Sequence, residues 1–596
     1  MDNPSTTGAH IIAKTLKELG VTSVFGIVGV PVSDIAEQAI NLGIRFIGFR
    51  NEQAASYAAT AYGYLTGKPG VCLVVGGPGV LHAIAGVGNA SANNFPLLLL
   101  GGSVETHQIT KGAFQELDSI SLLAPHTKLA VRPPNALSLP SIIANAYRSS
   151  FYGRPGTGFV DLPADIITDP VTSPQEVEKT PRVHSPPKGG ADETRLLKVV
   201  DLIKNAKAPL VLIGKGAAYA RAELVIRHFI NKTKLPFLPS PMGKGVVPDS
   251  HPQNVSSARS AALKSADVVL ILGARLNWIF HYGEAPKWNP AAQFIQVDIS
   301  AEELGRNAGN ADLALLGDIN IVVPQLSHQL GAWSYDPSIS PYTATLSTAK
   351  AKNETTAAKA ATDPSLPLTY NHAFHTIKST LHNLSPPDEG AIVYIAEGAN
   401  TMDISRSIFP LEHPRLRLDA GTYATMGIGL PYAIAAHEAY NAPNTRATPD
   451  RAPRKKIVAI EGDSAFGFSG MEIETMSRYG MDVLIFVFNN GGVYFGGEGT
   501  GEEWERRYGR TLRGEGERGL RSWSLGWETR YERMAGMGGG KGYFVRTGEE
   551  LVEATMKGYK DNVPVVVNVV VGSGKVEKPS FGWQVAPKKT INHPKL

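Results

Sequence analysis

The sequence predicts an α/β fold built from three parallel-sheet domains. Short apolar runs typical of buried parallel strands alternate along the chain with stretches of helical periodicity. Glycine and polar residues follow these runs, as expected where a strand turns into a helix. Two segments rich in proline, small residues and charge interrupt the alternation, at residues 172–193 and 333–368. A length of 596 residues is enough for three such domains.

These interruptions divide the chain into five parts. We expect an N-terminal domain, a central Rossmann-like domain, a linker, a C-terminal domain and a tail. Their predicted bounds are 1–185, 190–332, 333–368, 369–575 and 576–596.

The composition disfavours several classes of protein. The formal net charge is +4, and no basic helix with interleaved aromatic residues occurs, so we expect no nucleic-acid partner. No apolar run approaches the length needed to span a bilayer. Cys72 is the only cysteine, which excludes an intrachain disulfide and favours a reducing compartment. It lies in an apolar run and is expected to be a packed core residue.

The N-terminal domain should contain strands at residues 24–28, 44–49, 71–75 and 97–100. The second of these delivers Glu52, which opens an alanine-rich helix over residues 53–65. A carboxylate at that position can serve simply as a favourable charge at a helix N-terminus. The third strand ends in Gly76-Gly77-Pro78-Gly79, where close backbone packing is a better interpretation than a phosphate loop, because the Lys-Ser/Thr pair is missing.

The central domain repeats the alternation. Apolar runs at residues 210–213, 268–272 and 294–297 lead into Gly214-Lys215-Gly216, Gly273-Ala274-Arg275 and Asp298. A strand followed by a glycine-rich turn and a helix is typical of a Rossmann-like domain, although Gly-x-Gly alone is a weak signal.

The C-terminal domain holds the most informative stretch, residues 458–494. The apolar run 457–460 ends at Gly462-Asp463-Ser464, and a second run, 483–488, delivers Asn489-Asn490-Gly491-Gly492. Ligands of open α/β sheets bind at the carboxyl ends of the strands. The Asp463 carboxylate, the Asn490 amide oxygen and a backbone carbonyl near Gly492 suit Mg²⁺ carrying a diphosphate. The alternative is an ordinary strand-turn-helix with Asp463 as a helix cap.

The pairing of Gly462-Asp463-Ser464 with Asn489-Asn490 resembles the signature of thiamine diphosphate-dependent enzymes, over nearly the whole chain. Residues 462–476 are most similar to the branch that contains 2-hydroxyacyl-CoA lyases and oxalyl-CoA decarboxylases. The resemblance implies a pyrimidine-binding N-terminal domain, a Rossmann-like middle domain and a diphosphate-binding C-terminal domain. It also implies thiamine diphosphate and Mg²⁺ as cofactors.

The resemblance further implies roles for single residues. Glu52 would hydrogen-bond the pyrimidine N1′ of the cofactor, a task that needs a carboxyl group with a raised pKa in an apolar pocket. The Ala424 carbonyl would accept the 4′-amino proton, and Met426 would hold the pyrimidine against the thiazolium, with core filling as its alternative. The residues expected around the diphosphate and the metal are Tyr370, Asn400, Gly462, Asp463, Ser464, Asn490 and Gly492.

Other residues are candidates for the substrate side. The loop at residues 112–116 would lie over the reactive thiazolium, and its Phe114-Gln115 resembles the lyases, where oxalyl-CoA decarboxylases carry Tyr-Glu. The Gln115 amide can bind a substrate hydroxyl without adding charge; an exposed surface loop is the alternative. His82 is a candidate for proton transfer, with an ordinary satisfied histidine as the default interpretation.

In the central domain, Arg275 and Asp298 match positions that contact ADP in oxalyl-CoA decarboxylase. ADP or CoA is therefore a candidate ligand there. A purely structural domain, with Arg275 as a surface charge, is the alternative.

The activity that the resemblance implies is cleavage of a 2-hydroxyacyl-CoA to formyl-CoA and a fatty aldehyde one carbon shorter, as in fatty acid α-oxidation. Alternatives are an oxalyl-CoA decarboxylase, opposed by Phe114-Gln115, and an acetolactate synthase-like carboligase. A binding protein without turnover is disfavoured, since Glu52, Asp463 and Asn490 are all present. The hypothesis of a nicotinamide oxidoreductase, based on the central domain, has still less support.

The resemblance also bears on assembly and location. Glu52 and Asp463 would meet across a subunit interface, so a homodimer or homotetramer is expected. Pro594-Lys595-Leu596 partly matches the Ser-Lys-Leu address read by the peroxisomal import receptor, so we expect a peroxisomal protein, with a cytoplasmic one as the alternative. Residues 496–523 depart from the family and predict either a mobile loop or an altered substrate lid.

Overall fold

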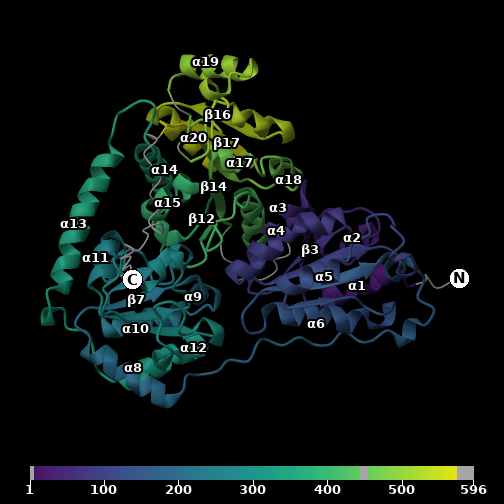
Figure 1. Ribbon diagram of the computed structural model, residues 1–596, viewed down its shortest axis with the longest axis horizontal. Helices are drawn as coiled ribbons and strands as arrows, with labels where there is room; N and C mark the ends of the chain where they lie inside the picture. The colour runs from purple at the N-terminus through teal and green to yellow at the C-terminus, as the bar shows by residue number, and fades with distance from the viewer. Residues whose placement is uncertain (1–5, 443–453, 495, 498, 574–596) are drawn as a thin grey trace, which may run out of the picture.

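The computed structural model describes residues 6–442, 454–494, 496–497 and 499–573, and it contains three parallel β-sheets covered by helices (Figure 1). In Figure 1 the N-terminal domain lies at the right, the middle domain at the lower left and the C-terminal domain at the top. All the strand pairings within these sheets are parallel, which confirms the predicted α/β fold class. The predicted tail and the Pro594-Lys595-Leu596 ending lie outside the described residues.

The N-terminal sheet has six strands in the order β2-β1-β3-β4-β6-β5. Its central strands are fully buried apolar runs, as predicted. The strands are β1 Ser23–Gly26, β2 Arg45–Gly48, β3 Gly70–Val74, β4 Leu97–Ser103, β5 Leu129–Val131 and β6 Thr157–Pro163. The α-helices are α1 Gly8–Glu18, α2 Ser33–Asn41, α3 Glu52–Thr66, α4 Pro78–Asn93, α5 Ser119–Leu123, α6 Leu139–Phe151 and α7 Ala164–Thr168.

The middle sheet has five strands in the order β11-β10-β9-β7-β8. Its strands are β7 Pro209–Ile213, β8 Phe237–Pro239, β9 Val268–Leu272, β10 Gln293–Asp298 and β11 Leu315–Leu316. Its α-helices are α8 Glu193–Asn205, α9 Lys215–Tyr219, α10 Glu223–Thr233, α11 Arg259–Ser265 and α12 Ile319–Leu330.

The C-terminal sheet has six strands in the order β13-β12-β14-β15-β17-β16. Its strands are β12 Ile392–Ala396, β13 Arg417–Asp419, β14 Lys456–Gly462, β15 Leu484–Asn489, β16 Lys541–Val545 and β17 Val565–Val570. Its α-helices are α14 Tyr370–Leu384, α15 Ala399–Ile408, α16 Gly429–Asn441, α17 Asp463–Phe466, α18 Glu472–Arg478, α19 Gly501–Leu512 and α20 Gly548–Lys560.

The N-terminal and C-terminal domains share a hydrophobic core, in which the alanine-rich helix α3 packs against α16. Small side chains let the two helices approach closely. Polar contacts cross the same boundary: the Asn89 amide donates to the Tyr432 hydroxyl at 2.7 Å, and Arg45 pairs with Glu438 at 2.8 Å. The middle domain has a core of its own.

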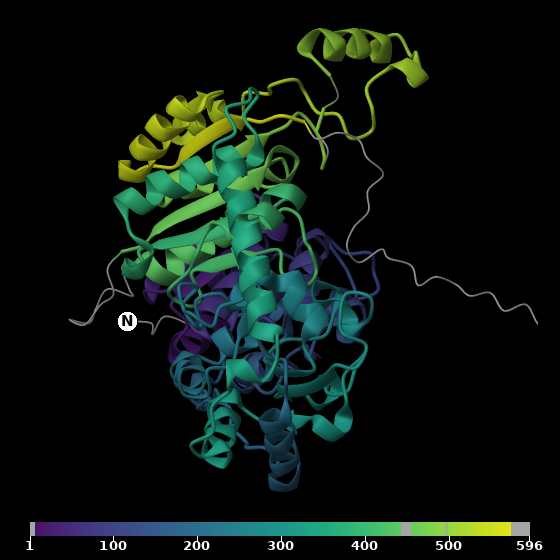
Figure 2. The same cartoon turned by 90° about the vertical axis from the view of Figure 1, so that its left-hand side faces the viewer.

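Two segments that were expected to be a linker and a loop contain helices. Helix α13 (Tyr342–Ala361) crosses from the middle domain toward the C-terminal domain (Figure 1), and it buries only Tyr342 and Leu346. Helix α19 stands away from the rest of the molecule (Figure 2). Thr500 and Glu503 form a capping box at its start, and Trp504 stacks on Tyr508. Among the described residues, no helix is both long and apolar enough to cross a membrane.

Candidate active site

Polar side chains gather where three neighbouring strands of the C-terminal sheet end. Strands β12, β14 and β15 lie side by side and run in the same direction. Asn400 lies just beyond β12, Asp463 directly follows β14, and Asn490 directly follows β15. The parallel sheet therefore brings these three side chains to one edge, as the strand ends predicted for Asp463 and Asn490 and the resemblance implied for Asn400.

Asp463 is buried and faces backbone donors. Its carboxylate accepts hydrogen bonds from the N–H groups of Ser464 at 2.7 Å and Gly491 at 2.9 Å. Burial raises the pKa of Asp463 to about 7, although the N–H groups of Ser464 and of the 490–492 turn oppose that shift. A buried carboxylate whose hydrogen bonds come from backbone N–H groups suits a cation, which would supply a positive charge beside it.

Asn490, Asn400 and Tyr370 surround the same edge. The amides of Asn490 and Asn400 both donate to the Tyr494 carbonyl, at 3.3 Å and 2.8 Å. The Tyr370 ring stacks on Phe488, with ring centroids 5.6 Å apart. Burial raises the pKa of the Tyr370 hydroxyl, nearby Asp463 raises it further, and the Asn400 and Asn490 amides lower it. The predicted diphosphate residues thus lie together.

Two further details of this edge are the break in the segment after Asp463 and the small number of carboxylates. The segment after Asp463 is not one helix: α17 has only four residues, and α18 begins at Glu472. Backbone N–H groups at the 463–464 and 490–492 turns therefore face the site in place of a long helix N-terminus. No cluster of three or more His, Cys, Asp or Glu side chains suits a metal among the described residues, so a Mg²⁺ ion would depend on Asp463, neutral oxygens and the phosphates.

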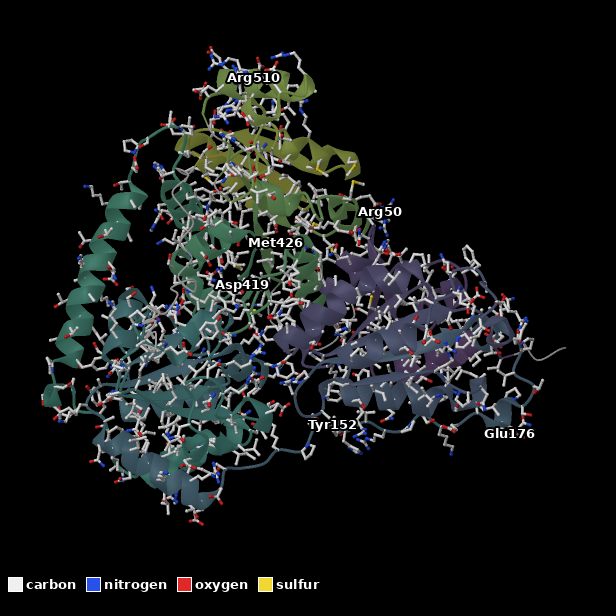
Figure 3. All side chains as sticks on the ribbon, viewed as in Figure 1. Arg50, Tyr152, Glu176, Asp419, Met426 and Arg510 are labelled. Atoms are coloured by element: carbon white, nitrogen blue, oxygen red, sulfur yellow. The ribbon has the colours of Figure 1, made fainter. Side chains whose placement is uncertain are left out.

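The loop that carries Ala424 and Met426 is held by Glu397, a residue that the sequence analysis did not select. Glu397 is fully buried after β12 and accepts hydrogen bonds from the N–H groups of Gly427 and Gly429. Burial raises the pKa of the Glu397 carboxyl group. Met426 is half-buried, lies centrally in the molecule (Figure 3), and follows Ala424, whose φ is 54°. The only sequence signal for Glu397 was its place directly after an apolar run.

A second cluster lies in the N-terminal domain. Glu52 is the first residue of α3, whose N-cap is Asn51. Its carboxylate lies 2.9 Å from Nδ1 of His82, on α4. The Glu52 side chain is 15% exposed, whereas that of His82 is 60% exposed. The structure therefore pairs two of the predicted catalytic residues at an accessible place.

The predicted loop over this cluster contacts the start of α4. Gln115 is half-buried with a φ of 57°, and its carbonyl oxygen lies 2.6 Å from where a Cβ on Gly77 would stand. Gly77 is the N-cap of α4, which carries His82. Glu116 fixes the loop by accepting N–H groups of Thr110, Gly112 and Ala113, and these hydrogen bonds lower its pKa.

A cavity of about 810 Å³ lies where the three domains meet. Arg275, which follows strand β9, and Asp298, the last residue of the adjacent strand β10, both line it. Burial raises the pKa of Asp298 to about 6. Asp419 and Thr422 of the C-terminal domain also line the cavity, and Arg275 donates to the Thr422 hydroxyl at 3.2 Å (Asp419, Figure 3). A cation and a carboxylate in a cavity of this size suit a nucleotide.

Comparison with known proteins decides the family. Three family models match the chain in succession: the thiamine pyrophosphate enzyme N-terminal TPP binding domain at residues 6–122, the central domain at 196–326 and the C-terminal TPP binding domain at 397–569. The chain belongs to the thiamine pyrophosphate enzymes.

Curated relatives of this thiamine pyrophosphate enzyme match it over nearly its whole length. The 2-hydroxyacyl-CoA lyase 1 of Homo sapiens is 44% identical, over 97% of this chain and 96% of the relative. The 2-hydroxyacyl-CoA lyase of Saccharomyces cerevisiae is 40% identical, over 98% and 100%. The oxalyl-CoA decarboxylase of Escherichia coli is 37% identical, over 99% of both chains. The resemblance of residues 462–476 to the branch of 2-hydroxyacyl-CoA lyases and oxalyl-CoA decarboxylases is therefore confirmed.

The residues present fit the family's cofactor. The edge around Asp463 offers one carboxylate, amide oxygens and backbone N–H groups, which are suitable partners for a metal diphosphate. Glu52 belongs to a different cluster, in which its partner is His82. The roles assigned to single residues, including Gly492, Ala424 and Met426, remain predictions.

Proposed function

We propose that this thiamine pyrophosphate enzyme is a Mg²⁺-dependent lyase that cleaves 2-hydroxyacyl-CoA thioesters to formyl-CoA and an aldehyde one carbon shorter. The observation that carries the proposal is the Phe114-Gln115 loop, packed on Gly77 beside the Glu52–His82 pair. This loop places the neutral amide of Gln115 where the substrate is expected to bind. Relatives with the lyase name, at 38–44% identity over 95–98% of this chain, support the same conclusion.

The two clusters have separate tasks in this proposal. Bound thiamine diphosphate supplies the electron sink for carbon–carbon cleavage. Asp463 and Asn490 hold Mg²⁺, with the Gly492 carbonyl, while Gly462, Ser464, Asn400 and Tyr370 surround the diphosphate. Glu52 hydrogen-bonds the pyrimidine, and Ala424 and Met426 orient it.

The substrate is held by neutral and cationic groups. The Gln115 amide binds the 2-hydroxyl, and His82, exposed beside Glu52, is the residue of this chain best situated to take the hydroxyl proton. The cavity beside Arg275 and Asp298 takes ADP or the nucleotide part of CoA.

The proposal extends to assembly and location. Glu52 and Asp463 belong to different domains with separate partners, so we infer that they meet on one cofactor across a homodimer, alone or within a tetramer. The chemistry suits peroxisomal α-oxidation.

Oxalyl-CoA decarboxylase is the second candidate, because one full-length relative carries that name. Turnover with thiamine diphosphate and Mg²⁺ separates the two, with 2-hydroxyoctadecanoyl-CoA and oxalyl-CoA offered separately. We expect formyl-CoA plus the shortened aldehyde from the first substrate, lost in Glu52→Ala. Formyl-CoA and carbon dioxide from oxalyl-CoA alone would replace our proposal with the decarboxylase.

A further inference from the structure

Strand β2 is an edge strand of the N-terminal sheet, so among the described residues no strand lies on one side of its backbone. The N–H groups of Arg45 and Phe49 point inward, to the Thr22 and Gly26 carbonyls beside β1. Along a strand the backbone N–H and C=O groups of successive residues point to opposite sides. Those of Phe46, Gly48 and Arg50 therefore point outward. Edge groups of this kind need other partners when they are buried.

Side chains of the C-terminal domain supply those partners. The Tyr479 hydroxyl donates to the Phe46 carbonyl at 2.9 Å and accepts the Gly48 N–H at 2.8 Å. Arg478 donates to the Gly48 carbonyl at 2.7 Å. The Glu472 carboxylate accepts the Arg50 N–H at 3.2 Å. We call Glu472, Arg478 and Tyr479 the edge clamp.

Glu472 is the buried member of the edge clamp. The residue is 1% exposed, and the Thr475 hydroxyl donates to its carboxylate at 2.7 Å. Arg50 and Arg478 are the charged groups that face it. Figure 3 shows Arg50 where the N-terminal and C-terminal domains meet.

The edge clamp is continuous with both clusters of the active site. On one side, Arg50 is followed directly by Asn51, the N-cap of α3, and by Glu52. On the other side, α18 belongs to the same connection between β14 and β15 that begins with Asp463. A shift at Arg50 would therefore displace the Glu52 carboxylate.

We propose that Glu472 is a positioning residue for Glu52, acting through the Arg50 N–H, and that Arg478 and Tyr479 assist it by fixing the outer edge of β2. The inference rests on the proposed function, because it takes Glu52 as the group that activates the cofactor. Glu472 acts in this proposal through its hydrogen bonds with Arg50 and Thr475, without contact to the cofactor or the substrate.

The test compares Glu472→Leu, which cannot accept the Arg50 N–H, with Glu472→Gln, which can. The first readout is hydrogen–deuterium exchange of the protein alone, where Glu472→Leu should lose protection at Arg50. The second is exchange of the C2 proton of bound thiamine diphosphate. We expect a loss of about 10–100-fold in that rate for Glu472→Leu, since small misplacements of a catalytic group have effects of this size. Cofactor affinity should stay within about threefold, and Glu472→Gln should restore the rate.

Asp482→Asn is the matched control, because it removes another buried carboxylate of the same domain, paired with Arg454 and Lys456. It should lower thermal stability without slowing C2 exchange. If Glu472→Leu does not fold, Tyr479→Phe decides: slower exchange supports the inference, and wild-type exchange overturns it.

The failures are distinguishable. Slow exchange in Glu52→Ala but wild-type exchange in Glu472→Leu overturns the inference alone. Wild-type exchange in Glu52→Ala overturns the proposed function and the inference together. Equal loss in Glu472→Gln and Glu472→Leu also overturns the inference, because the amide keeps the acceptor.

Discussion

Burial governs the protonation of several carboxyl groups around the active site. It raises the pKa of Glu397, and it raises the pKa of Glu472 to about 7, against hydrogen bonds that lower both. Each group therefore keeps its proton in the folded protein at pH values where the unfolded chain has released it. Stability that depends on such a group is present at low pH and is lost as the pH rises toward 7.

The substitution Glu472→Gln should remove one such dependence. The pKa of Glu472 is raised from 4.5 to about 7, so wild-type stability should fall by up to about 1.4 kcal/mol per pH unit more steeply than that of the variant between these values. Thermal midpoints across a pH series measure the difference. The control is Glu474→Gln, which should act in the opposite direction, because the side-chain hydrogen bond from Arg478 lowers the pKa of Glu474. Parallel curves for wild type and Glu472→Gln would contradict the prediction.

The substitution Asp463→Asn tests the metal assignment. Loss of the carboxylate should weaken Mg²⁺ binding in the presence of thiamine diphosphate by more than the roughly 10–100-fold that loss of an outer-shell partner costs. Isothermal titration measures the affinity, with Asp482→Asn as the control. An unchanged affinity in Asp463→Asn would remove Asp463 from the ligand set.

At the scale of single elements, the contact between the Gln115 loop and the start of α4 predicts a selective defect. A Cβ at Gly77 would lie 2.6 Å from the Gln115 carbonyl oxygen. Gly77→Ala should therefore displace the loop and lower kcat by about tenfold or more, while cofactor affinity changes little. The matched control is Gly331→Ala, which has a similar φ of 59° and nothing within 4 Å of its Cβ. Equal kcat in both variants would show that the loop does not depend on this contact.

The capping boxes of α19 and α20 each begin with a threonine, and replacing that threonine with alanine should have different effects in the two helices. Thr500→Ala, at the start of the outlying helix α19, should lower the local stability of that helix by about 1 kcal/mol. The population of molecules in which α19 is unfolded should therefore rise about fivefold. Tryptic cleavage within α19 should accelerate accordingly at an unchanged melting temperature. Thr547→Ala removes the corresponding cap of α20, which packs against α14, and should lower the melting temperature instead. The same response in both variants would contradict this difference.

The strands and helices differ in how well the local sequence predicts their bounds. Strand β9 was predicted at its observed bounds, because an unbroken apolar run of this length is typical of a buried parallel strand. Strands β5 and β6 were missed: β5 is a three-residue, half-buried edge strand, and β6 contains the buried Asp161. Helices α13 and α19 were read as a linker and a loop because their polar composition shows little burial.

At the scale of the whole molecule, the separate Glu52 and Asp463 clusters predict complementation between inactive variants. If the two meet across a dimer, a mixed dimer of Glu52→Ala and Asp463→Asn chains keeps one intact site. Half of randomly mixed dimers are of that kind, each with one site of two, so about a quarter of wild-type activity should return. Activity after co-refolding measures this. Mixed dimers that form but stay inactive would place both residues at the site within one chain.

The active site was predictable where its residues follow strands. Asp463 and Asn490 were predicted to lie together because each follows a buried strand and parallel strands end at one edge of a sheet, whereas Asn400 was expected there from the family resemblance. Glu397 and the edge clamp were not found, because their hydrogen-bond partners come from distant parts of the chain. Such contacts leave no periodicity or spacing in the local sequence.

The outer edge of β2, which the edge clamp covers in the folded protein, also has a consequence during synthesis. Glu472 follows Arg50 by 422 residues. At roughly 5–20 residues per second, the ribosome needs roughly 20–80 s to reach α18 after it has made β2. Throughout that interval the nascent N-terminal domain presents an open strand to its neighbours on the polysome, which is the geometry that seeds aggregation. Chaperone demand during translation should therefore be set by the late arrival of α18.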